Sequence, residues 1–464
     1  MLTSFAAMVL AIPAPCYGVD PPALEGSHVW VEYPASLSET QAMTVLEASD
    51  AAWDIYEQEL GWLPPSQSIK MRADLATDTA YGQCVTVACE DDDVPLCSIF
   101  GPAFDDNEHA QTSAHEMGHA FQYALMGSYL DSLASWAWWM EGTASWIENF
   151  YAEDPRVWSR VGQYVANPQW GLHSDFSDLF AGVRGDHMYG TAVLAYFLEQ
   201  EYGGPDTVRA TWEWGAEHSG EKIFFRDAIE GIGLSFDEVW PHYLATLSVL
   251  DLEGGENVEA IPGHMVINAL PGEGAPPAAS LPEGLGFGVV HLPATLGMAG
   301  MDLRVELDAE AAVPWHAVLA RTDGVTPGSA VLDYAVATWD DAGHGEVVLT
   351  GFDGSADAFL VVSPESIEKH PFGYSLRAEL VPAGAADGST SSDASTTDGG
   401  ATATGSDDGG SETTTAPASE GAAGCSCSSA HGAGGAAWCV PVVAVWARRR
   451  RSASAASRPS RCAR

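Results

Sequence analysis

Apolar side chains in the first part of the chain recur at helical spacing. Residues 39–62 carry them three and four positions apart, which predicts an amphipathic helix that Gly61 ends. Residues 68–75 alternate between apolar and polar side chains and predict a short strand, and residues 84–104 predict further strands and turns. Further helices are predicted over residues 113–126, 190–202 and 236–252. We therefore expect a small sheet followed by a mostly helical part over residues 20–252.

The pattern changes to period two in the second half of the chain. Polar and apolar side chains alternate over residues 302–307 and 374–380, with turn signals such as Asp353-Gly354 between them. Alternation of this kind predicts an antiparallel β-sandwich, which we place over residues 284–381. The preceding residues 253–283 are rich in Gly, Pro and Ala and are expected to form a linker. The predicted fold class is therefore α+β.

Composition and charge narrow the class of protein. Apolar residues make up 46% of the 464 residues, and sixteen tryptophans can fill large cores. The net charge of −45 disfavours binding to nucleic acid, whose phosphates attract basic surfaces. Cys84, Cys89 and Cys97 fall within the first predicted domain, and one disulfide among them is expected outside the cytoplasm.

The helix predicted over residues 113–126 contains His115-Glu116-Met117-Gly118-His119. Residues four apart share a helix face, so both imidazoles can reach one cation while Glu116 points beside it. These residues are the minimal apparatus of a zinc-dependent hydrolase. Catalytic zinc takes three protein ligands and leaves another position to water, so a third ligand is needed.

Two known patterns supply that ligand differently. The metzincin pattern requires Gly at position 122 and His at position 125, but the chain has Gln122 and Leu125, which excludes this pattern. The other pattern takes a glutamate from a following helix, and the chain offers Trp138-Trp139-Met140-Glu141-Gly142-Thr143-Ala144-Ser145-Trp146. In these two motifs, within roughly residues 100–250, the chain resembles the gluzincins, a group of zinc metallopeptidases.

The gluzincin resemblance implies a zincin-like catalytic domain in which His115, His119 and Glu141 hold one catalytic zinc ion. It also implies that Glu116 is the general base, which takes a proton from a zinc-activated water during attack on a peptide bond. The alternative for Glu141 is a solvated acid near a helix start, where the helix dipole favours it.

Further site residues are expected around these ligands. Many gluzincins carry an acid four positions after the ligand glutamate, where it orients a metal-bound histidine; this chain has Ser145 there, with Glu148 as a possible substitute. Tyr189 is the first candidate for a donor to the oxyanion and His187 the second, although a tyrosine at that place can also be a packed core residue. By analogy with zincins, residues 98–102 are expected to form the edge strand on the substrate side.

The two ends of the chain predict export. Residues 1–19 are apolar and then small, and are expected to be a signal peptide, with a start that lacks a basic region. Residues 382–424 contain only small, acidic and hydroxyl residues and proline, which predicts a disordered tether. Residues 425–464 carry Cys425 and Cys427, then an apolar run and a cluster of arginines.

That order resembles the myxobacterial C-terminal sorting tail called MYXO-CTERM. The resemblance implies processing near Cys425 or Cys427 and attachment to the outer membrane or cell surface; a disordered basic tail is the alternative. The leading hypothesis is an exported, surface-attached zinc metallopeptidase with a protein or peptide substrate. The alternatives are a zinc hydrolase of a non-protein amide and a non-catalytic surface adhesin that binds through the β-sandwich.

Overall fold

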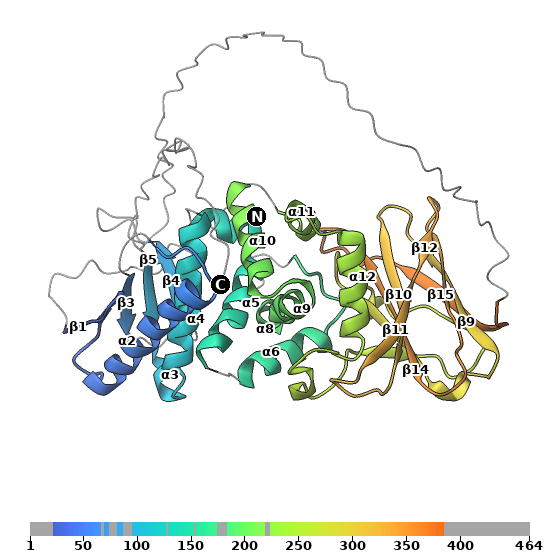
Figure 1. The fold of residues 1–464 in the computed structure, drawn as a ribbon, viewed down its shortest axis with the longest axis horizontal. Helices are drawn as coiled ribbons and strands as arrows, with labels where there is room; N and C mark the ends of the chain where they lie inside the picture. Colours follow the sequence, from blue (N-terminus) through green and yellow to red (C-terminus); the bar gives the residue numbers. More distant parts are fainter. Residues whose placement is uncertain are drawn as a thin grey trace, which may run out of the picture. The chain divides into compact units, whose positions relative to one another are not determined.

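The computed structural model describes residues 22–65, 69–73, 81–86, 95–126, 129–152, 155–173, 183–218 and 223–384, which all belong to one compact unit (Figure 1). The predicted signal peptide, Cys89, the predicted tether beyond residue 384, and the sorting tail with Cys425 and Cys427 lie outside the described residues. The described part is a mixed α+β fold with three five-stranded sheets, which confirms the predicted fold class at that level. No helix in this part of the chain is long and apolar enough to cross a bilayer.

The first sheet has the strand order β1-β2-β3-β5-β4. Its strands are β1 (Ala23–Glu25), β2 (Val29–Glu32), β3 (Ile69–Ala73), β4 (Gly82–Thr86) and β5 (Pro95–Ile99). Strands β2, β3 and β5 run parallel to one another, whereas β1 and β4 are antiparallel to their neighbours. Strand β3 confirms the strand predicted over residues 68–75, and every second side chain along it is buried.

The edge of this sheet corrects one prediction. Residues 98–102 are not the edge strand, because β5 is enclosed between β3 and β4, and β4 is the outermost described strand on that side. Helix α3 (Gly101–Asp105) begins directly after β5. Pro102 stands in its first turn, where the missing N–H costs no hydrogen bond and the fixed φ favours a helix. A disulfide joins Cys84 of β4 to Cys97 directly opposite on β5.

The helices follow the hydrophobic pattern. Helix α2 (Glu39–Asp54) opens with a capping box between Ser38 and Gln41 and continues into the π-helical turn η1 (Ile55–Glu59). The helices that follow along the chain are α4 (His109–Met126), α5 (Tyr129–Tyr151), α6 (Pro155–Ala166), α8 (Val183–Gly190), α9 (Ala192–Tyr202), α10 (Pro205–Glu217), α11 (Phe225–Gly231) and α12 (Phe236–Leu247). Helices α2, α4, α9 and α12 confirm the four predicted helices. Gly203, at a φ of 114°, ends α9 in the left-handed region that glycine favours.

Helix α4 is held between the first sheet and the other helices. Trp53 and Tyr56, from α2 and η1, both pack edge-on against Phe121 of α4, with ring centroids 5.1 and 5.6 Å apart. The hydroxyl of Tyr56 donates a hydrogen bond of 2.9 Å to the carbonyl oxygen of Ala114. These contacts fix the position of α4 one residue before His115.

The other two sheets have the orders β11-β10-β14-β8-β6 and β12-β13-β9-β15-β7. Their strands are β6 (His264–Val266), β7 (Gly272–Gly274), β8 (Gly288–Leu292), β9 (Met301–Ala309), β10 (Trp315–Thr322), β11 (Val331–Val336), β12 (Thr338–Trp339), β13 (His344–Leu349), β14 (Asp357–Pro364) and β15 (Tyr374–Pro382). One apolar cluster joins the two sheets and includes Leu319 and Leu360 from one sheet and Val305 and Leu376 from the other.

Strand β10 is buried on both of its faces. Alternate residues of β10, such as Val318 and Ala320, belong to the same apolar core as the helices, whereas Leu319 faces the other sheet. Helix α12 lies against the sheet that contains β10 (Figure 1), and Trp240 Nε1 on α12 donates to Ser363 Oγ on β14 at 3.3 Å. Arg226 also bonds Glu365, so polar contacts join the helical part to the sheet.

Residues 253–283 correct a second prediction. The segment expected to be a linker contains β6, which pairs with β8, and β7, which pairs with β15. It therefore forms part of two sheets and does not separate two compact units. Each of these strands has three residues, which is too short to show a period of two in the sequence.

Candidate metal centre

Small residues allow α4 and α5 to approach closely at the two histidines. A Cβ atom on Gly118 would lie 2.8 Å from Ile147 Cγ2 and 3.6 Å from Ala144 Cα, both on α5. On the other side of α5, a Cβ on Gly142 would lie 2.1 Å from Thr191 Oγ1. Because neither position has room for a side chain, Gly118 allows α4 to lie close against α5, and Gly142 allows α5 to lie close against the segment at Thr191.

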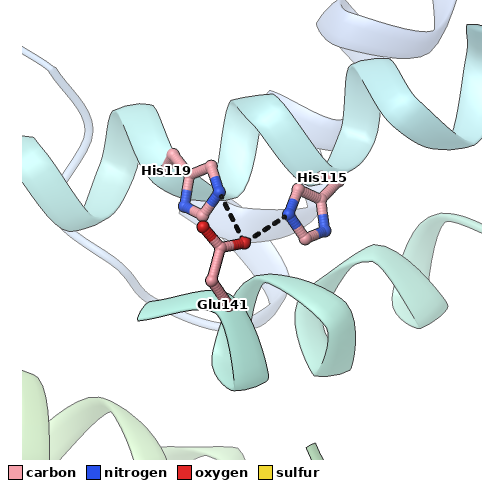
Figure 2. Close-up of side chains that lie close together, drawn as sticks. All are labelled: His115, His119 and Glu141. Carbon is pink, nitrogen blue, oxygen red and sulfur yellow. Dashed lines mark hydrogen bonds and ion pairs between the residues drawn. The ribbon is translucent and has the colours of Figure 1, made fainter. Parts of the chain in front are cut away.

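The two histidines of α4 face one carboxylate of α5 (Figure 2). Glu141 Oε2 lies 3.4 Å from His115 Nε2 and 3.5 Å from His119 Nε2. All three side chains are buried, with exposed fractions of 6% for His115, 4% for His119 and 5% for Glu141. The burial removes the alternative of a solvated acid for Glu141, since a buried carboxylate needs charged partners.

The spacing of these three ligand atoms fits a metal ion. A tetrahedral ion with ligands at about 2.0–2.1 Å holds neighbouring ligand atoms about 3.3–3.4 Å apart. Both distances to Glu141 Oε2 match that separation, and they are longer than the 2.7–2.9 Å or so of a charge-assisted hydrogen bond. His115, His119 and Glu141 therefore form a group that can hold a cation.

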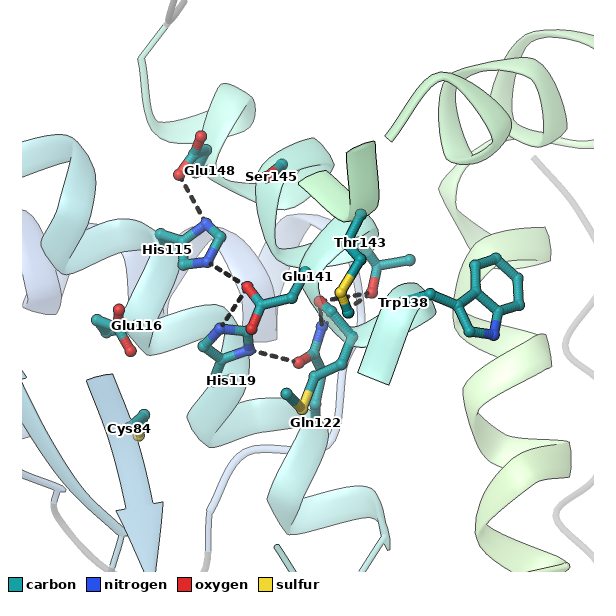
Figure 3. Close-up of polar contacts among 12 residues, drawn as sticks. Cys84, His115, Glu116, His119, Gln122, Trp138, Glu141, Thr143, Ser145 and Glu148 are labelled. Atoms are coloured by element: carbon teal, nitrogen blue, oxygen red, sulfur yellow. Dashed lines mark hydrogen bonds and ion pairs between the residues drawn. The ribbon is translucent and has the colours of Figure 1, made fainter. Parts of the chain in front are cut away.

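The other ring nitrogens of the histidines are held by acceptors (Figure 3). His115 Nδ1 lies 2.9 Å from Glu148 Oε2, and His119 Nδ1 lies 2.8 Å from Gln122 Oε1. A carboxylate and an amide oxygen can only accept, so each Nδ1 carries a proton, and each Nε2, on the side of Glu141, is the nitrogen left to bind a metal. Fixing the tautomer in this way is how outer partners prepare a histidine to bind metal.

Gln122 is itself fixed by α5. Its amide nitrogen donates to the carbonyl oxygen of Met140 at 3.0 Å and to Thr143 Oγ1 at 2.8 Å. Thr143 in turn donates to the carbonyl oxygen of Trp139 at 2.6 Å. These bonds orient the Gln122 amide with its oxygen toward His119. Gln122 therefore presents an acceptor, and not a donor, to His119 Nδ1.

The electrostatics of the site couple the ligands to one another. Burial alone would lower the pKa of both histidines. The carboxylates outweigh that effect: Glu148 and Glu141 raise the pKa of His115, and Glu141 raises the pKa of His119. Burial also opposes ionisation of Glu141, but the two histidines outweigh it and hold the pKa of that carboxyl well below its usual range. Glu141 is therefore a carboxylate that needs positive charge beside it.

Glu116 lies on α4 among these groups and has different surroundings. It is 4% exposed, and its Oε2 has no hydrogen-bond partner within the described part of the chain. A Cβ on Gly82 of β4 would lie 2.4 Å from Glu116 Oε1, so the edge strand passes directly over the carboxyl group. Burial, with further effects from Glu141 and Glu148, raises the pKa of Glu116 to about 8. A carboxyl group that titrates near neutral pH is suited to take up and release a proton.

The two candidates for an oxyanion donor lie in different environments. The ring of Tyr189 lies 5.8 Å from the ring of His115, between centroids, and is partly exposed. His187 is 1% exposed and packs against the rings of Tyr164 and Trp170. Burial lowers the pKa of His187 to about 3, so this side chain is a neutral core residue. The structure therefore brings Tyr189, but not His187, to the site.

The partner of His115 corrects the assignment of Ser145. Ser145 Oγ accepts a hydrogen bond of 3.2 Å from Arg160 Nη1, and the partner of His115 is Glu148, which the sequence offered as the substitute. Both positions share the α5 face that carries Glu141, but Glu148 lies nearly one turn further along the helix. Its longer side chain reaches His115, whereas the Ser145 hydroxyl faces α6.

Sequence reasoning missed two residues of this site. Gln122 lies three positions after His119 on the same helix face, so its contact could have been predicted from spacing. Arg160 comes from α6, and nothing in the sequence indicates that α6 packs here. No protein-family model matches this chain, and no curated protein matches it significantly. Function is therefore argued from the geometry of the site.

Proposed function

We propose that this protein is an exported zinc metallopeptidase in which His115, His119 and Glu141 hold one zinc ion. The observation that carries the proposal is the convergence of two Nε2 atoms on one Glu141 oxygen while Glu148 and Gln122 hold both Nδ1 atoms. Zinc bound there would polarise a substrate carbonyl and lower the pKa of a water molecule to about 7.

The donor set favours zinc over the common hard cations. Two imidazole nitrogens and one carboxylate oxygen match the ligands of known catalytic zinc sites, whereas Ca²⁺ and Mg²⁺ prefer oxygen ligands only. Three protein ligands also leave a position open for water or substrate, as a catalytic site requires. A purely structural site would have no use for the buried carboxyl of Glu116, whose Oε2 has no hydrogen-bond partner in the part of the chain that the structure describes.

Glu116 acts as the proton carrier in this proposal. Its buried Oε2 has no hydrogen-bond partner among the described residues, and its pKa of about 8 allows the carboxyl to exchange a proton near neutral pH. It takes a proton from the water that attacks the amide carbon and delivers that proton to the leaving nitrogen. Gly82 keeps the space beside Glu116 Oε1 free, because a larger residue there would displace the carboxyl group.

Tyr189 donates a hydrogen bond to the oxyanion that forms on the substrate carbonyl. Burial, and then the charge of Glu141, raise the pKa of its phenol well above the ordinary value, so the hydroxyl keeps its proton at neutral pH. A neutral phenol is a donor, whereas a phenolate would repel the oxyanion.

The fold and the disulfide support the rest of the proposal. A mixed sheet with an antiparallel edge strand, next to the helix with both histidines, fits a zincin-like domain. The two later sheets share an apolar cluster, which fits an accessory β-sandwich. The bond between Cys84 and Cys97 fits an exported protein, since disulfides persist in oxidising compartments. Attachment to the cell surface by the tail is part of the same proposal and rests on the sequence of that tail.

The test is hydrolysis of a mixed peptide library by the full chain with zinc, alongside Glu116→Gln. We expect cleavage by the wild type, and loss of cleavage in the variant with zinc binding retained, because glutamine keeps the shape of glutamate but cannot accept the proton. Cleavage at equal rates by both proteins would refute the role of Glu116. Zinc binding without peptide cleavage would favour a non-protein amide as substrate, or a surface adhesin.

A further inference from the structure

Arg160 of α6 meets three parts of the candidate site at once. Its Nη1 donates to Glu148 Oε1 at 3.1 Å and to Ser145 Oγ at 3.2 Å. Its guanidinium carbon also lies 4.7 Å from the centroid of the Tyr189 ring. One side chain therefore contacts both the carboxylate that holds His115 and the proposed oxyanion donor.

The packing of α6 against α8 creates this arrangement. A Cβ on Gly190 would lie 2.4 Å from the carbonyl oxygen of Arg160 and 2.5 Å from Tyr164 Cβ, so the α6 backbone touches α8 where there is no side chain. Tyr189 directly precedes that glycine, and its ring consequently lies beside the Arg160 side chain. The contact between Arg160 and Tyr189 therefore depends on how α6 packs against α8.

Arg160 also matters for the charge of the site. Glu141 and Glu148 are exposed by only 5% and 1%, and carboxylates this deeply buried need charged or hydrogen-bonding partners. Arg160 Nη1 lies 3.1 Å from an oxygen of Glu148 and pairs with that carboxylate.

We infer that Arg160 is a positioning residue, which holds Glu148 against His115 and the Tyr189 ring beside the metal site. This inference rests on the proposed function, because it assumes zinc at the three ligands. In this inference Arg160 acts through Glu148 on metal affinity and through Tyr189 on the reaction. A planar guanidinium can stack on an aromatic ring while its N–H groups bond a carboxylate, a geometry that the compact ammonium group of lysine does not reproduce.

The test compares full-chain variants Arg160→Met and Arg160→Lys with a matched control, Arg184→Met. Arg184 pairs with Glu283 at 2.7 Å and lies 5.0 Å above the Trp170 ring, so it has the same kinds of contact away from the ligands. Zinc affinity is measured by competition with a chelator, thermal unfolding of the metal-free protein reports folding, and kcat and KM are measured on a cleaved peptide.

We expect Arg160→Met to weaken zinc binding by about 10-fold or more, within the range known for outer partners of metal ligands. Arg160→Lys should recover most of the zinc affinity, because it restores the charge, but should keep a lowered kcat, because a compact ammonium group does not stack on the Tyr189 ring as a planar guanidinium does. Arg184→Met should keep wild-type zinc affinity. Wild-type zinc affinity in Arg160→Met, or equal weakening in Arg184→Met, would overturn the inference. Failure of the wild type to bind zinc would instead overturn the proposed function.

Discussion

The substitution Glu148→Gln tests which residue orients His115. Glu148 is 1% exposed, and its two oxygens contact His115 Nδ1 at 2.9 Å and Arg160 Nη1 at 3.1 Å. Glutamine has nearly the same shape and can still offer one oxygen to His115, but it removes the negative charge. The matched control is Ser145→Ala, at the position where the gluzincin pattern places the orienting acid.

The magnitude follows from the role of such outer partners. Their loss costs about 10–100-fold in metal affinity, or roughly 1.4–2.7 kcal/mol. The effect of Glu148→Gln should lie in this range, because the charge on Glu148 makes His115 more basic and stabilises the positive charge that a bound cation brings. Ser145→Ala removes only the hydrogen bond of 3.2 Å from Arg160, so we expect a change of less than about threefold.

The assay is competition for zinc between each protein and a chelator of known affinity, with thermal unfolding of the metal-free proteins as the check on folding. Weaker zinc binding in Glu148→Gln, with unfolding near that of the wild type, would support the role of Glu148. If Ser145→Ala weakens zinc binding as much as Glu148→Gln does, the assignment of the orienting residue is refuted.

Three further predictions concern catalysis, packing and pH. Tyr189→Phe should lower kcat by about 10²–10³-fold without changing zinc content, as expected for loss of one oxyanion donor; an unchanged kcat would exclude that role. Gly142→Ala should destabilise the fold by about 1–3 kcal/mol, because its Cβ would lie 2.1 Å from Thr191 Oγ1; unfolding in denaturant measures this, and wild-type stability would contradict it. His187 has a pKa lowered to about 3 by burial, so the unfolded state binds a proton between pH 6.5 and about 3 that the folded state does not. The free energy of unfolding should fall with decreasing pH there by up to about 1.4 kcal/mol per unit, and His187→Phe should reduce this slope; an equal slope in the variant would contradict it.

Local patterns predicted the helices and the candidate ligands. His115 and His119 are one helical turn apart, so any helix through them places both on one face. The position of Glu141 opposite them depends on the contact between α4 and α5. The sequence indicates that contact only through the resemblance of its two motifs to those of gluzincins. Gly118 explains that contact, but a glycine inside a helix predicts close packing only once its neighbour is known.

The missed features depend on contacts between distant segments. The gluzincin pattern indicates position 145 as the partner of His115. Glu148 contacts His115 instead, because of where along α5 the helices α4 and α5 cross. Arg160 reaches the site through the packing of α6 on α8. Strand β4, and not β5, forms the edge of the first sheet because β4 pairs outside β5, and alternation within one strand does not reveal its neighbours.

The central claim is that one zinc ion at His115, His119 and Glu141 supports hydrolysis. The most direct test is a zinc titration of chelator-treated full-chain protein, in which bound zinc and peptide cleavage are measured in the same samples. We predict that cleavage rises with zinc and levels off at about one equivalent, and that Glu141→Gln loses this tight binding. Cleavage that persists in the metal-free protein, or tight zinc binding that is unchanged in Glu141→Gln, would contradict the claim.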